Sequence, residues 1–123
     1  MNSKSILITG CLLLGVAVAL GAFGAHGLQK HLSLKELNTF QTGIRYQFYH
    51  SFAILFAGLI SLHKVKVQSS VYCFLIGILL FSGNCYLYAI TKIKFIAMII
   101  PIGGVAFIIG WPMLAKNIYK DLK

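Results

Sequence analysis

Acidic residues are almost absent from this chain. Its 123 residues include only Glu36 and Asp121 against eleven Lys and Arg, for a net charge of +9. Charged residues make up 11% and apolar residues 59%, whereas an ordinary soluble domain has about 25% charged residues. The shortage of carboxylates excludes a paired acid/base site, and neither a Ser-His-Asp arrangement nor a P-loop motif is present. We therefore expect lipid to be the main solvent of this chain and expect no catalytic machinery.

Disulfide and zinc-site patterns are missing as well. Cys11, Cys73 and Cys85 lie inside apolar runs and form no C-x-x-C pair, so we expect them to be small packed side chains. The lysines lie between and beside apolar runs, with no basic stripe of interleaved aromatics, which argues against nucleic acid as a partner. Cations in such positions favour contact with the anionic head groups of membrane lipids.

Four apolar runs are long enough to cross a bilayer as helices, which takes about 20 residues each. They cover approximately residues 6–26, 43–62, 71–90 and 95–114. The first run follows Lys4 as in a signal peptide, but it continues past the candidate cleavage sites, so we expect it to be retained. Short connections favour antiparallel neighbours. The predicted fold class is an all-α integral membrane protein, one domain over residues 1–123, with four transmembrane helices in an antiparallel up-down bundle.

The connection between the first two spans, residues 27–42, is the longest. Within it Ser33 and Glu36 have the spacing of a capping box at a helix start. Leu34, Leu37 and Phe40 then recur at helical spacing. This pattern predicts a short interfacial helix that lies flat on the membrane between spans one and two.

Small residues recur in the first and last spans at spacings that allow helix backbones to approach closely. Ala17, Gly21 and Ala25 are four residues apart. Packing inside the bundle is favoured over self-association as the use of these faces. The predicted packing residues are Ala17, Gly21, Gly24, Ala25, Gly103 and Gly104.

The distribution of Lys and Arg predicts the orientation. Lys4, Lys64, Lys66, Lys116, Lys120 and Lys123 lie on the side of the two termini, whereas Lys30, Lys35, Arg45, Lys92 and Lys94 lie on the other. Because cytoplasmic segments carry the excess of these residues, we expect both termini in the cytoplasm.

Polar side chains at membrane depth mark the candidate site. Arg45 and His50 lie in the first turns of span two, and Tyr46 and Tyr49 lie on the same or an adjacent helical stripe. Such groups usually face the bundle interior or a partner, so we expect a cluster in the membrane half next to the first connection. The candidate ligand-binding residues are His26, Arg45, Tyr46, Tyr49, His50, Asn84 and Tyr86.

Three interpretations of this cluster remain open. It is structural if Arg45 extends to the interface, the tyrosines form an aromatic belt and the histidines bond to the backbone. Alternatively, Arg45 and a histidine anchor a quinone or a lipid head group. A third interpretation has His26 and His50 as axial ligands of haem. No carboxylate lies at this depth and the usual metal-ligand spacings are absent, so we expect no metal and no resident cofactor.

Several motifs carry a resemblance to a known family. They are GAFGAHGL from Gly21, TGIRYQFYH from Thr42, LFSGN from Leu80, PIGG from Pro101 and the pair Gly110-Trp111. Through them the chain resembles domain-of-unknown-function family 423, small bacterial membrane proteins whose animal relatives are called transmembrane protein 256. The resemblance implies a four-helix fold and the bacterial inner membrane, with no established reaction.

The function expected is therefore that of a multi-pass membrane protein with a structural, accessory or lipid-contacting role. Its expected partners are membrane lipids, together with another membrane protein or a second copy of the chain. The alternative is a binder of quinone, lipid head group or haem at the polar cluster.

Overall fold

The chain folds into four long helices and contains no strand. The structure, a computed structural model, describes all residues 1–123. The second and fourth long helices are α2 and α5, whereas the first and third each include a π-helical turn, named η1 and η2. In chain order the elements are α1 Ser3–Phe23, η1 Gly24–Leu28, α2 Leu34–Ser61, α3 Gln68–Gly77, η2 Ile78–Ser82, α4 Gly83–Thr91 and α5 Lys94–Asp121.

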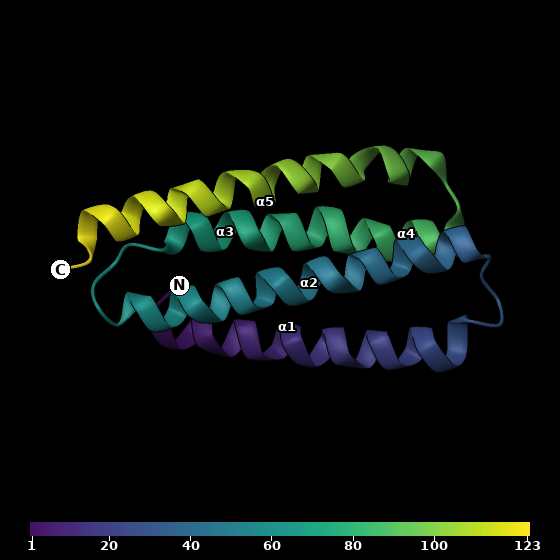
Figure 1. The fold of residues 1–123 in the computed structure, drawn as a ribbon, viewed down its shortest axis with the longest axis horizontal. Helices are drawn as coiled ribbons and strands as arrows, with labels where there is room; N and C mark the ends of the chain where they lie inside the picture. The colour runs from purple at the N-terminus through teal and green to yellow at the C-terminus, as the bar shows by residue number, and fades with distance from the viewer.

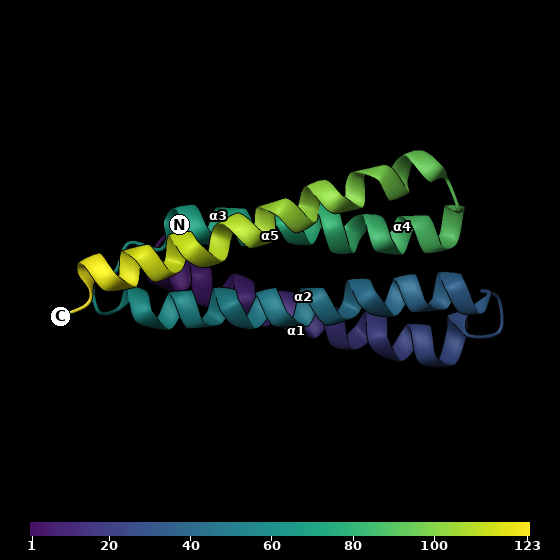
Figure 2. The ribbon, with the colours of Figure 1, turned by 45° about the horizontal axis from the view of Figure 1, so that its top comes forward.

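Successive helices run antiparallel, and both termini lie at the same end of the molecule (Figure 1). Helix α1 packs chiefly against α2, and α5 packs against α3, η2 and α4. Figure 2 shows the two resulting hairpins one above the other, and in Figure 1 α2 is seen beside both α1 and the second hairpin. This arrangement confirms the predicted all-α up-down bundle.

Three of the four helices are long and apolar enough to span a membrane, namely those over Ser3–Leu28, Gln68–Thr91 and Lys94–Asp121. Helix α2 is less apolar because Gln41, Arg45, Gln47 and His50 lie along it. It has 28 residues and so extends about 42 Å. Since α2 packs against α1 on one side and against the second hairpin on the other, it crosses the bilayer with them.

The prediction of a separate interfacial helix is wrong. Residues 34–42 form the first turns of α2, which continues without a break to Ser61. The predicted cap is present, because Ser33 Oγ accepts a hydrogen bond from the Glu36 N–H at 3.5 Å. The Glu36 carboxylate does not reach back to the cap. It pairs with the Lys92 ammonium at 3.4 Å, in the connection between α4 and α5.

The physical reason for the continuous helix lies at Gly43. The predicted second span begins at residue 43, but the backbone of Gly43 is buried against α4. A Cβ atom there would lie 2.8 Å from the Cβ of Cys85 and 2.8 Å from Cε1 of Tyr86. Glycine at this position therefore permits a close helix crossing, and no proline interrupts the segment.

The predicted stripe of Ala17, Gly21 and Ala25 does not face one neighbour. Ala17 is fully buried, Gly21 is half-buried and Ala25 is exposed. A four-residue repeat advances about 40° too far at each step of a 3.6-residue helix, so Ala25 points away from α2. The small residues buried against α2 are Gly10, Ala17 and Gly24, whose seven-residue spacing is typical of left-handed helix pairs.

Candidate functional site

His50 lies at the centre of the bundle, where it is 4% exposed. Its Nε2 accepts a hydrogen bond from the Trp111 Nε1–H at 3.1 Å, because an indole nitrogen can only donate. Its Nδ1–H therefore donates to the Tyr46 carbonyl at 2.7 Å. The ring stacks on Phe107, with centroids 3.5 Å apart and 9° between the planes. Both nitrogens of this histidine are thus occupied by protein partners.

A second set of buried bonds joins α2 to the other hairpin. The Tyr86 hydroxyl donates to Gln47 Oε1 at 2.6 Å, and the Gln47 amide donates to the Leu13 carbonyl of α1 at 2.9 Å. The Ser82 hydroxyl donates to the Gly43 carbonyl at 2.7 Å. Helix α2 is therefore hydrogen-bonded to both of its neighbours within the membrane.

Gln47 was not among the predicted site residues, although it is only 2% exposed. Gly43, Gln47 and His50 follow one another at spacings of four and three residues. That spacing places them on a single helix face, and this pattern could have identified Gln47 as an interior residue.

Two of the predicted site residues, Arg45 and Tyr49, lie on the outer side of α2. Arg45 is exposed, and its only side-chain hydrogen bond goes from Nη2 to the Thr42 hydroxyl at 3.0 Å. Tyr49 is 55% exposed and Tyr46 is 38% exposed, and their rings meet edge to face at 5.6 Å. Arg45 and Tyr49 form an outward polar surface that is separate from the buried bonds of His50 and Gln47, whereas the Tyr46 ring packs against Phe81 of the second hairpin with centroids 4.7 Å apart.

The structure does not bring His26 to His50, contrary to expectation. His26 is exposed in η1, and its neighbour Gly24 packs against Phe40 near the start of α2. His50 is ten residues further along α2, a distance of about 15 Å. One metal ion cannot bind both imidazoles across that distance.

Asn84 is also engaged locally. Its side-chain amide donates to the Leu80 carbonyl at 2.7 Å, inside the wide turn of η2, where the Gly83 N–H bonds to the Ile78 carbonyl five residues earlier. Gly103 of α5 packs onto the backbone of this same turn. The π turn, Asn84 and Gly103 therefore form one helix crossing.

Arg45 lies well inside the bilayer. Lys35 and Lys64 flank α2 at the two membrane surfaces, and the midpoint between them falls at His50. Arg45 is ten residues from Lys35, which corresponds to about 15 Å along the helix, and it lies about 7 Å from the midpoint. His50 consequently lies near the middle of the segment of α2 between these two lysines.

The buried polar side chains of α2 mainly hold helices together. No group of three or more His, Cys, Asp or Glu is placed to hold a metal ion, and the three cysteines are unpaired. The four-helix fold and these buried hydrogen bonds are those of a small multi-pass helical membrane protein whose interior polar groups bond to other groups of the same chain.

Comparison with known proteins places the chain in a family. Residues 20–104 match the family model described as protein of unknown function, DUF423. A UPF0382 membrane protein of Staphylococcus saprophyticus is 42% identical over 118 residues, which are 95% of this chain and 98% of that protein. A UPF0382 membrane protein of Haemophilus influenzae is 46% identical over 105 residues, 85% of each chain. The UPF0382 inner membrane protein YgdD of Escherichia coli K12 is 38% identical over 117 residues, 93% of this chain and 88% of that protein.

The chain belongs to this DUF423 (UPF0382) family, as its motifs indicated. It is an integral membrane protein of the bacterial plasma membrane, in agreement with the names of its relatives and with the three apolar spans. No solved structure matches it.

Proposed function

We propose that this chain is a non-catalytic accessory protein that binds another membrane protein through the outer face of α2. This face is defined by Gln41, Arg45 and Tyr49, which are spaced four residues apart and are all exposed. The observation that carries the proposal is the exposure of the Arg45 guanidinium inside the bilayer with one hydrogen-bond partner.

The interior of the bundle supports a structural role for the remaining polar groups. His50, Gln47, Tyr86 and Ser82 each bond to another helix or to their own backbone. A ligand at these atoms would have to displace hydrogen bonds that hold α2 in place. The outward residues have no such engagement and are therefore the ones free to bind a partner.

An Arg that faces lipid at this depth is costly. Translocon-based scales give about 2.5–3.5 kcal/mol for Arg at a helix centre, which is an upper bound for Arg45 because its guanidinium bonds to Thr42, one turn nearer the membrane surface. A guanidinium has five N–H donors, and Thr42 accepts from only one of its nitrogens. A partner helix that presents a carboxylate or backbone carbonyl at this level would remove much of that cost and would make the contact orientation-specific.

The chain itself offers no carboxylate for this purpose, which favours a different protein over a second copy. Its two acids are Glu36, which pairs with Lys92, and Asp121, which accepts from the Lys66 N–H at the opposite end. Glu36 lies nine residues before Arg45, about 13 Å along α2.

The proposal is tested by photo-crosslinking in native membranes. A photoreactive amino acid replaces Tyr49, and the matched control replaces Leu79, which is 70% exposed near the middle of the third span. We expect a discrete protein adduct at position 49, at least fivefold weaker when Arg45→Leu is added, and no such adduct at position 79.

Arg45→Lys keeps the charge but loses the planar fork of donors, so we expect it to restore the adduct only in part. Adducts to lipid alone at position 49, or equal protein adducts at positions 49 and 79, would refute the proposal. A discrete small-molecule adduct at position 49 would refute it too, in favour of the ligand-binding interpretation.

A further inference from the structure

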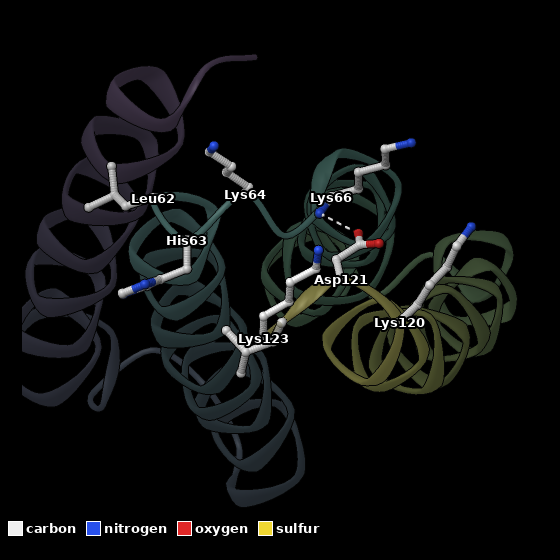
Figure 3. A pocket seen from close by; sticks show the side chains of 8 residues that line it. Leu62, His63, Lys64, Lys66, Lys120, Asp121 and Lys123 are labelled. Carbon is white, nitrogen blue, oxygen red and sulfur yellow. Dashed lines mark hydrogen bonds between the residues drawn. The ribbon is translucent and has the colours of Figure 1, made fainter.

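The membrane face that carries both termini has a basic depression of about 540 Å³. It lies between the connection from α2 to α3 and the end of α5 (Figure 3). We refer to it as the basic depression. Its polar lining consists of His63, Lys64, Lys66, Lys120, Asp121 and Lys123.

The lysines of the basic depression have no anionic partner in the protein. The one ion pair of the structure joins Lys92 to Glu36 at the opposite end. Asp121 is the single carboxylate here, and its Oδ2 accepts from the backbone N–H of Lys66 at 2.9 Å. The depression is thus lined by four lysines and one carboxylate that is already hydrogen-bonded, so its net positive charge favours an anion.

The backbone of this region is held in place from both sides. Lys66 donates its N–H to Asp121, and its carbonyl accepts from the Asn117 amide at 2.7 Å. Lys64 adopts a left-handed conformation with φ of 66°, which is unfavourable for a residue other than glycine. A lysine at a position suited to glycine therefore adds a positive charge at the rim of the depression.

An apolar groove of about 480 Å³ adjoins the basic depression and shares His63, Leu122 and Lys123 with it. The rest of its wall comes from Phe56, Leu59 and Ile60 of α2. Two of these, Phe56 and Leu59, are 49% and 56% exposed, and they point toward the lipid below the lysines. A cationic site thus continues directly into an apolar wall that runs toward the membrane interior.

We propose that this combined site binds one anionic glycerophospholipid, with its phosphate among the lysines and an acyl chain along Phe56 and Leu59. The charge of the depression selects an anion, and the continuous apolar wall selects a ligand with a hydrocarbon chain. Phosphate esters are the anions that lysine clusters bind at membrane surfaces. This inference is independent of the partner-binding face of Arg45.

The test is native mass spectrometry of the full-length protein in detergent with added phosphatidylglycerol or phosphatidylcholine of identical chains. The decisive variant is Lys64→Gly with Lys123→Gln. Replacing Lys64 by glycine relieves the left-handed backbone, so this change does not endanger folding. The matched control is Lys92→Gly with Lys94→Gln at the other end, where Lys92 is also left-handed with φ of 59°.

We expect wild type and control to bind one phosphatidylglycerol in preference to phosphatidylcholine. In the decisive variant we expect that preference to fall roughly 30-fold, since each lysine contributes roughly fivefold. An equal loss in both variants, or no preference in wild type, would overturn the proposal. A second experiment adds inorganic phosphate or glycerol phosphate as a competitor. If either displaces the lipid at a concentration similar to that of the lipid, the site binds phosphate without an acyl chain, and the proposal is overturned as well.

Discussion

Gly103 and Gly104 differ sharply in what surrounds them, although they are neighbours in α5. A Cβ atom at Gly103 would contact the Phe81 backbone nitrogen and would lie 2.7 Å from the Leu80 carbonyl carbon and 2.8 Å from the Phe81 Cα. At Gly104 the nearest atoms are those of the Phe81 ring, at 3.7 and 3.8 Å. Gly103→Ala therefore presses on backbone that cannot rotate away, and Gly104→Ala makes an ordinary contact.

The magnitude follows from these distances. Carbon atoms pack best at about 3.5–4.0 Å, so α5 and η2 must separate by roughly 0.7–1 Å to admit Gly103→Ala. Overpacking of this kind costs about 1–3 kcal/mol. The gain of about 0.5–1 kcal/mol from alanine in a helix interior applies equally to both positions and cancels. We expect Gly103→Ala to be less stable than Gly104→Ala by about 1–3 kcal/mol.

The assay is equilibrium unfolding in mixed micelles of dodecyl maltoside and sodium dodecyl sulfate. Trp111 is the only tryptophan and lies about two turns from Gly103 along α5, and its fluorescence reports the contact with His50 of α2. Gly104→Ala should unfold at the wild-type fraction of dodecyl sulfate or higher, and Gly103→Ala at a clearly lower fraction. Equal midpoints for the two variants would refute the claim that η2 and α5 meet backbone to backbone at Gly103.

Two further predictions concern single hydrogen bonds. Tyr86→Phe removes the donor to Gln47 and should lower the free energy of unfolding by about 0.6–2 kcal/mol in the same assay. The control Tyr88→Phe loses no side-chain hydrogen bond and should leave the stability unchanged. Equal losses in the two variants would argue against the buried bond. Asp121→Ala removes the acceptor of the Lys66 N–H, so hydrogen exchange at this amide should accelerate by about 2- to 13-fold, and an unchanged rate would show that the carboxylate does not hold the connection.

The four helices could be predicted because their signal is local. Each span needs a certain length of apolar residues, and the short connections force antiparallel order. The start of α2 could not be predicted in the same way. Gly43 is compatible with a boundary or with a close crossing, and only the position of Cys85 and Tyr86 on another helix decides between them.

The candidate site was predictable only in part, for a related reason. The exposed residues Arg45 and Tyr49 and the buried residue His50 lie within six positions of one another, and polarity alone does not separate the two sides of a helix. Their separation depends on which neighbours pack against α2. The depth of His26 and the adjacency of the first two spans predict that it joins the cluster, but the contact of Gly24 with Phe40 places it about ten residues along α2 from His50.

The contacts of α2 also indicate what holds the two hairpins together. Lipid tails are as apolar as the side chains, so burial of apolar surface does not drive helix association here. Three buried bonds link α2 to the second hairpin, through Gly43, Gln47 and His50. At about 0.6 kcal/mol each, the average measured within membranes, they supply roughly 2 kcal/mol. Close packing at glycines such as Gly43 must therefore supply much of the remaining attraction between the hairpins, with the polar bonds setting the rotation of α2 about its axis.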